Sequence, residues 1–181
     1  MGETAQSKLA WLSRLMAWLA TIGAVVGPLV VAAVFVWPDL RSGESLDVDH
    51  LGHLLSDAVP LPYRLAALAF ALGAQAFTVW ALWSLRTLFL RYAEGEVFSP
   101  AALKALNHVA VALLASVVVG FVIQAPITAL LTWSLGHGHR AIAFNFGSGD
   151  ITTLFIAGTV LVIARVMNEA GRIAEENAKF V

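Results

Sequence analysis

Four histidines fall in the two polar segments that interrupt an otherwise apolar chain: His50, His53, His137 and His139. The first two share one face if their segment is helical, and the second two flank a single glycine. Three aspartates lie near them in the sequence, Asp47, Asp49 and Asp150. Imidazoles and carboxylates are ligands of zinc, nickel and copper(II), so these residues are a candidate divalent metal site. The alternative is a set of solvated loop histidines, because neither pair alone has an established metal-ligand spacing.

Amide side chains inside the long apolar stretches form a second candidate site. Gln75 lies in the stretch 63–85, and Gln124 lies just before Pro126 in the stretch 109–135. Proline removes a helical hydrogen bond, so a kink is expected near Pro126. A polar path at these three residues in a small transporter or channel subunit is one hypothesis. The other is hydrogen bonding between helices, which is the commoner role of amides in membrane spans.

The sequence predicts no catalytic site. The chain has no cysteine, which excludes disulfides, thiolate metal sites and thiol catalysis. It also lacks a phosphate-binding glycine loop, a Gly-x-Ser-x-Gly elbow and a His-Glu-x-x-His motif. No acid or base lies in 15–37, 65–85 or 109–135, whereas enzymes and proton pumps need such groups in the membrane. We therefore expect a non-enzymatic protein without catalytic residues or a cofactor.

The apolar stretches predict the fold class. Hydrophobic residues make up 59% of the 181 residues and charged residues 13%, which is typical of an integral membrane protein. A helix needs about 20 apolar residues to cross a bilayer. Four stretches approach or exceed this length, at about 15–37, 63–85, 109–135 and 151–168. We predict a single all-α membrane domain over 1–181, with four transmembrane helices in two antiparallel hairpins.

The fourth stretch is shorter than the others, since it is uncharged only from Ile151 to Ala164. We expect Asp150 to be the N-cap of a helix that continues past the membrane into an amphipathic tail, 165–181. The apolar face of this tail is predicted to comprise Val166, Ala170, Ile173 and Ala174. Such a face must be covered, so we expect Ile173 to contact the central stretch of the chain or a partner.

Basic residues orient the protein. Most of them precede the first span or lie in the central stretch 86–106 and the tail: Lys8, Arg14, Arg86, Arg91, Lys104, Arg165, Arg172 and Lys179. Cytoplasmic segments are enriched in lysine and arginine. Both termini and the central stretch are therefore expected in the cytoplasm, and the histidine segments outside the inner membrane. A net charge of −1, with the basic residues scattered, argues against a nucleic-acid partner.

The central stretch carries turn and helix-start signals. A charged break at residues 94–96 precedes Ser99, a good N-cap, and Pro100, which suits the first helical position. An ordinary turn between helices is one interpretation and a partner-binding surface is the other. The residues expected to bind a partner lie here and in the tail: Glu94, Gly95, Glu96, Phe98, Ile173 and Glu176.

Gly23 and Gly27 form a Gly-xxx-Gly pattern in the first span. This spacing lets two helix backbones approach closely. One interpretation is a homo-oligomer joined through this face. The favoured interpretation is close packing within the chain, because glycine is common in membrane helices.

Three segments form a recognisable pattern: Arg91 to Ser99 (RYAEGEVFS), Asp150 to Thr152 (DIT) and Ala164 to Asn177 (ARVMNEAGRIAEEN). With the four-span layout, they resemble a family of small bacterial membrane proteins, domain of unknown function 2975 (DUF2975). The resemblance implies a four-helix inner-membrane protein, and some relatives are encoded beside small helix-turn-helix regulators. It supplies no catalytic residues. The two histidines of the first outer segment are not a feature associated with the family.

The function expected from these observations is that of a sensor or regulatory protein in the lipid bilayer. The most charged segments, the central stretch and the tail, are both assigned to the cytoplasm, and we expect them to bind a protein partner there. The alternative is the small transporter or channel subunit with its path near Gln75, Gln124 and Pro126.

Overall fold

The computed structural model of the chain describes residues 2–37, 59–133, 142, 144 and 146–178, with side chains described from 7 to 173 within these ranges. These residues form four helices: α1 (Gly2–Val36), α2 (Leu61–Ala93), α3 (Pro100–Trp133) and α4 (Ser148–Ala178). No strand occurs among them. Each helix contains a segment long and apolar enough to cross a membrane. The prediction of four membrane-length helices is confirmed, and the chain has the build of a multi-pass membrane protein.

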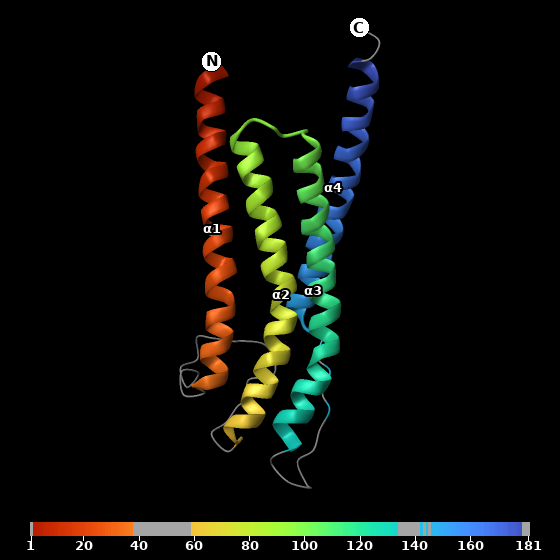
Figure 1. Ribbon diagram of the computed structural model, residues 1–181. Helices are drawn as coiled ribbons and strands as arrows, with labels where there is room; N and C mark the ends of the chain where they lie inside the picture. The colour runs from red at the N-terminus through yellow and green to blue at the C-terminus, as the bar shows by residue number, and fades with distance from the viewer. Residues whose placement is uncertain (1, 38–58, 134–141, 143, 145, 179–181) are drawn as a thin grey trace.

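The helices pack in chain order. α1 packs on α2, α2 on α3 and α3 on α4, whereas α1 and α4 do not pack on each other in the described part of the chain. Figure 1 shows successive helices running in alternate directions, so the start of α1, the α2–α3 connection and the end of α4 lie at one end. We call this the turn end. α4 does not reach the opposite end, because it begins part-way along α3 (Figure 1).

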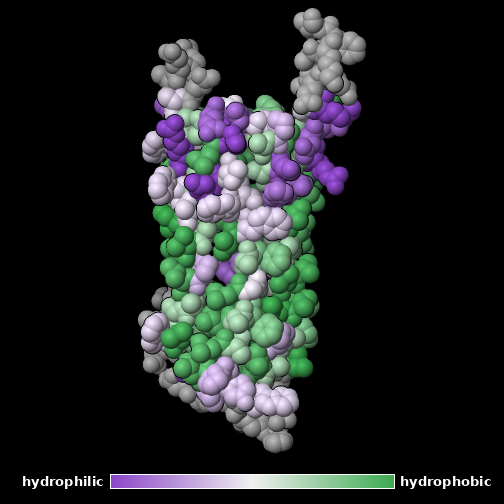
Figure 2. All heavy atoms as spheres, in the orientation of Figure 1, coloured by the Kyte–Doolittle hydropathy of each residue, from purple (hydrophilic) through white to green (hydrophobic). Residues whose placement is uncertain are grey.

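An apolar belt surrounds the middle of the bundle. In Figure 2 hydrophobic residues cover this zone, and hydrophilic residues gather at the turn end. Trp18 of α1 and Phe155 of α4 are 68% and 76% exposed. Large apolar side chains left this open would be costly in water, but they suit contact with lipid.

Two packed clusters hold the helices together. The cluster nearer the opposite end joins α1, α2 and α3: Val34, Phe35, Val59, Ala67, Ile127 and Leu131. The cluster nearer the turn end joins α2, α3 and α4: Leu88, Ala102, Ala105, Leu106 and Ala164. The second cluster is rich in alanine because small side chains let membrane helices approach closely.

Gly23 packs inside the chain. A Cβ built on it would lie 3.4 Å from Cδ1 of Leu82 on α2. This contact belongs to the α1–α2 interface, as the favoured interpretation of the Gly-xxx-Gly pattern expects. A homo-oligomer through Gly23 and Gly27 stays a prediction.

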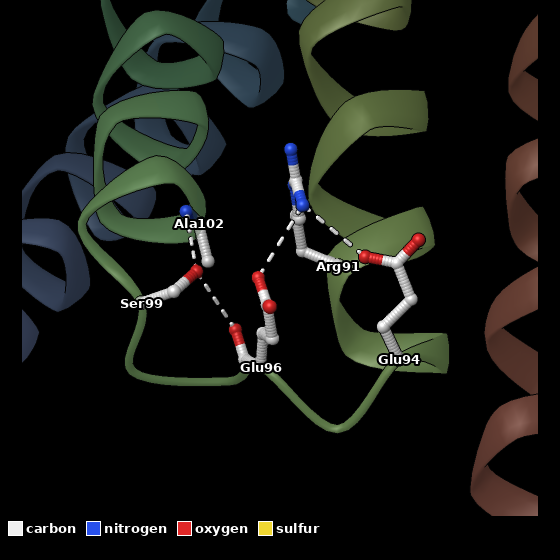
Figure 3. Close-up of polar contacts among 5 residues, drawn as sticks. All are labelled: Arg91, Glu94, Glu96, Ser99 and Ala102. Atoms are coloured by element: carbon white, nitrogen blue, oxygen red, sulfur yellow. Dashed lines mark hydrogen bonds and ion pairs between the residues drawn. The ribbon is translucent and has the colours of Figure 1, made fainter.

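The α2–α3 turn forms as its sequence predicts. The Oγ atom of Ser99 accepts a hydrogen bond from the N–H of Ala102 at 3.2 Å, so Ser99 caps α3 and Pro100 opens it. Gly95 has a φ of 81°, a conformation that glycine adopts without steric cost. Figure 3 shows the Arg91 side chain directed at two carboxylates, those of Glu94 at 3.2 Å and Glu96 at 3.4 Å.

α4 docks on α3 by a different face from the predicted one. Val160, Ala164 and Met167 belong to or pack against the cluster near the turn end, and a Cβ on Gly171 would lie 3.2 Å from Cδ1 of Leu103. These positions form one helical stripe. The predicted contact residue, Ile173, is 48% exposed, so the expectation that it makes the intrachain contact is wrong. The helix uses small residues against its neighbour and turns bulky residues outward, as membrane helices commonly do.

Candidate functional site

A cavity with several polar side chains in its lining lies inside the bundle. Its volume is about 410 Å³, and all four helices contribute to its walls. Most of the lining is apolar, as with Val31 of α1 and Ile123 of α3. The polar members come from α2, α3 and α4: Gln75, Thr78, Ser116, Gln124, Asp150 and Thr153. The two glutamines selected from the sequence therefore line the same space, whereas Pro126 is not part of the lining.

Gln75 lies against α1 at a glycine. A Cβ on Gly27 would come within 2.9 Å of the Nε2 atom of Gln75, which is closer than such atoms approach in proteins. Gly27 thus makes room for the amide. Neither the Gln75 amide nor the Thr78 hydroxyl has a hydrogen-bond partner among the described residues. Both residues are partly buried, so the Gln75 amide and the Thr78 hydroxyl are available to bond to a molecule in the cavity.

The other hydroxyls donate to their own helices. Ser116 donates to the carbonyl of Leu113 at 2.7 Å, and Thr153 donates to the carbonyl of Gly149 at 2.9 Å. A hydroxyl has one donor hydrogen and two acceptor lone pairs. With the hydrogens engaged in this way, Ser116 and Thr153 present acceptor oxygens to the cavity.

Asp150 contributes a carboxylate to the cavity lining. Its Oδ2 atom accepts a hydrogen bond from the N–H of Gly147 at 2.9 Å, and the carbonyl of Gly147 accepts from the N–H groups of Asp150 and Ile151 at 3.1 and 3.3 Å. Gly147 is therefore the N-cap, and Asp150 stands three residues later, as in the second half of a capping box. The prediction that Asp150 is the N-cap is wrong, because the helix begins at Ser148.

The start of α4 lies beside the middle of α3. Phe121, inside α3, stacks near Phe144 with ring centroids 5.3 Å apart and near Phe146 at 6.2 Å. Ser116 and Gly120 of α3 share the cavity with Asp150. Asp150 is therefore an acid at the depth of the apolar belt, whereas the sequence analysis expected it at the outer start of the fourth helix. The signal that marks it is the apolar run AIAFNF at 141–146, which is suited to re-entering the bundle before the helix starts.

The cavity has a negative electrostatic character. Among the described lining residues, Asp150 is the charged member, and no lysine or arginine is found with it. Among the residues that the structure describes, Asp150 forms no ion pair. The N-terminus of α4 contributes a partial positive charge of about half a unit, which offsets part of the carboxylate's charge.

A packed layer bounds the cavity on the side of the opposite end. Val34, Phe35 and Ile127 line it and also belong to the cluster nearer that end. Towards the turn end, the alanine-rich cluster packs α2, α3 and α4 together. The side between α1 and α4 has no helix-to-helix contact in the described ranges. Hydrophilic atoms are visible within the apolar belt in Figure 2.

Comparison with known proteins gives a family assignment. The family model described as "Protein of unknown function (DUF2975)" matches residues 5–181, nearly the whole chain. The chain belongs to the DUF2975 family. No curated protein and no solved structure matches it. This assignment confirms the family resemblance that the sequence segments indicated. The cavity is the place in this DUF2975 member where ligand binding can be tested.

The other predicted site residues of this DUF2975 member are not brought to the cavity. His50, His53, His137 and His139 lie outside the described residues, so the metal-site hypothesis stays a prediction. Within the described ranges, no group of three or more histidines or acids is placed to hold a metal ion. The remaining histidine, His108 of α3, packs near Trp80 of α2 with ring centroids 5.8 Å apart.

The predicted partner-binding residues lie at the turn end. Glu94, Gly95 and Glu96 form the α2–α3 turn, where all three are exposed. Phe98 beside them is 61% exposed and Ile173 of α4 is 48% exposed. Glu176 is part of α4, but its side chain lies outside the described side chains.

Proposed function

We propose that this protein is a non-enzymatic receptor of the bacterial inner membrane that binds a small molecule with at least one polar group between its helices. The observation that carries this proposal is the cavity, in which six polar side chains from three helices meet inside an apolar belt. Its volume of about 410 Å³ lies in the range of small-molecule sites, roughly 300–1,000 Å³. Polar groups at this depth are costly and usually functional.

The packing at one end of the cavity supports a binding role over a continuous pore. Val34, Phe35 and Ile127 line the cavity and belong to the cluster nearer the opposite end, so conduction would require this layer to separate. A packed end suits a bound molecule, because the exclusion of water there strengthens polar contacts.

α4 supplies the link from the cavity to a regulatory output. Its first turns contribute Asp150 and Thr153 to the lining, and Gly171 near its far end packs on Leu103 beside the turn. A shift of α4 on binding is therefore expected to move the turn end as well. We place this end, with both chain termini, in the cytoplasm, where the exposed Phe98 and Ile173 are suited to contact a protein partner. The basic residues on this side support that orientation.

Cavity filling tests the proposal. Gly120 lines the cavity, and a Cβ added there meets nothing within 4 Å, so Gly120→Leu is expected to occupy the site without distorting the helix. Gly73 of α2 is exposed, lies outside the lining and has equally open space, which makes Gly73→Leu a matched control.

The measurement is native mass spectrometry of protein extracted with its surrounding lipid. We expect a bound small molecule on the wild type and on Gly73→Leu, and its loss from Gly120→Leu. The same bound species on all three proteins would refute the cavity as the binding site.

A second candidate function is transport of a small solute. The specific observation in its favour is that Gln75 and Gln124 line one cavity, as a polar path requires. Reconstitution in liposomes with solute-flux measurements distinguishes the two functions. Flux that is lost in Gly120→Leu and kept in Gly73→Leu would favour transport, and binding without flux would favour the receptor.

A further inference from the structure

We propose that the ligand of this cavity is a small organic cation, a protonated amine with an apolar body, and that Asp150 is its countercharge. The inference rests on the proposed function and adds the chemical class of the ligand. It follows from the charge, the hydrogen-bonding capacity and the size of the site, in that order.

The described residues supply no countercharge to the Asp150 carboxylate. One oxygen of the Asp150 carboxylate accepts the Gly147 N–H at 2.9 Å, and its other oxygen has no hydrogen-bond partner among the described residues. The partial positive charge of the α4 N-terminus amounts to about half a unit, so a net negative charge remains. A carboxylate in such a place is stabilised by a cation that occupies the space beside it.

The neighbouring polar groups also favour a donor. The Ser116 and Thr153 hydroxyls give their hydrogens to carbonyls of their own helices. They therefore offer acceptor oxygens, and the Gln75 amide offers one more acceptor. An ammonium group has three donors and no acceptor, which matches a lining that combines a carboxylate with these acceptor oxygens.

The size of the cavity argues against a bare metal ion. A metal ion needs several ligand atoms within about 2.0–2.6 Å, which would leave most of a cavity of about 410 Å³ unfilled. The apolar walls at Val31, Leu113 and Ile123 suit the hydrocarbon part of an amine. An anionic ligand is disfavoured because the part of the lining that the structure describes contains no lysine or arginine.

Three probes of one shape test the inference: phenethylamine, which is protonated at pH 7, the neutral 2-phenylethanol and the anionic 3-phenylpropionate. Each is titrated calorimetrically into the full chain in lipid nanodiscs, with protein-free nanodiscs as the blank. We expect the amine to bind about tenfold tighter than the alcohol or better, as a charge-assisted hydrogen bond provides. The carboxylate probe is expected not to bind.

Two variants test whether the preference for the amine over the alcohol arises in the cavity. Asp150→Asn keeps an oxygen to accept the Gly147 N–H and removes the charge, so the amine should lose its advantage over the alcohol. Gln75→Glu adds a second carboxylate to the lining and should tighten amine binding by about tenfold. Thermal unfolding of each variant verifies that it is folded.

The outcomes separate this inference from the proposed function. If the alcohol binds as tightly as the amine, or if Asp150→Asn keeps the preference, the cation assignment is wrong while a receptor for neutral molecules stands. Failure of the amine to bind the wild type also overturns the assignment. If binding persists in the cavity-filling variant Gly120→Leu, the proposed function itself fails.

Discussion

Gly171→Leu gives the sharpest test of how α4 is held on α3. A Cβ at Gly171 would lie 3.2 Å from Cδ1 of Leu103, which is already tight, and the rest of a leucine side chain has to displace Leu103. Leu103 is 9% exposed, so it has little room to move. Overpacking of this kind costs about 1–3 kcal/mol.

The matched control is Gly158→Leu in the same helix. A Cβ at Gly158 meets nothing within 4 Å, so this change adds the same side chain without a clash. Replacing glycine by leucine raises helix propensity by up to about 1 kcal/mol in either place. This gain cancels when the two variants are compared, and the difference between them isolates the contact with Leu103.

Hydrogen exchange of the α4 amides beyond Arg165 measures this difference. A cost of about 1–3 kcal/mol corresponds to roughly fivefold to 150-fold faster exchange through local opening. We expect that acceleration in Gly171→Leu and little change in Gly158→Leu. Equal exchange rates in the two variants would refute the conclusion that Gly171 docks α4 on α3.

Three further predictions concern the turn and the outer segments. Ser99→Ala should destabilise the start of α3 by about 0.5–2 kcal/mol through loss of its cap, measured by thermal unfolding beside the exposed-site control Ala101→Ser; an unchanged midpoint would contradict the cap. Gly95→Cys should react with a membrane-impermeant thiol reagent in inverted vesicles and not in intact cells, and labelling of intact cells would overturn the proposed orientation. Zinc, nickel or copper(II) titration should show tighter binding by the wild type than by the His50→Ala/His137→Ala double variant, with affinity falling below about pH 6.5 as the imidazoles protonate; equal, weak binding would leave solvated loop histidines.

The sequence by itself determined the features that depend on local composition and order. Its apolar content and the lengths of its uncharged stretches require helices that satisfy their own backbone hydrogen bonds in lipid, and the structure has four of membrane length. The cap at Ser99 and the break between helices at 94–96 were also readable, because caps and turns are set by a few neighbouring residues. The family assignment rests on the same kind of information.

The tertiary structure decided which helix faces meet, where α4 begins and what surrounds each polar group. In a membrane span both lipid and neighbouring helices are apolar, so hydrophobic periodicity does not reveal the packed face. This is why Gly171, and not Ile173, contacts α3. The same reason explains Asp150: its place in the sequence suggested an outer segment, but the chain re-enters beside Phe121 and brings this acid to Gln75 and the other lining groups. A site whose polar side chains come from three helices exists only after the helices pack, because no single segment contains it.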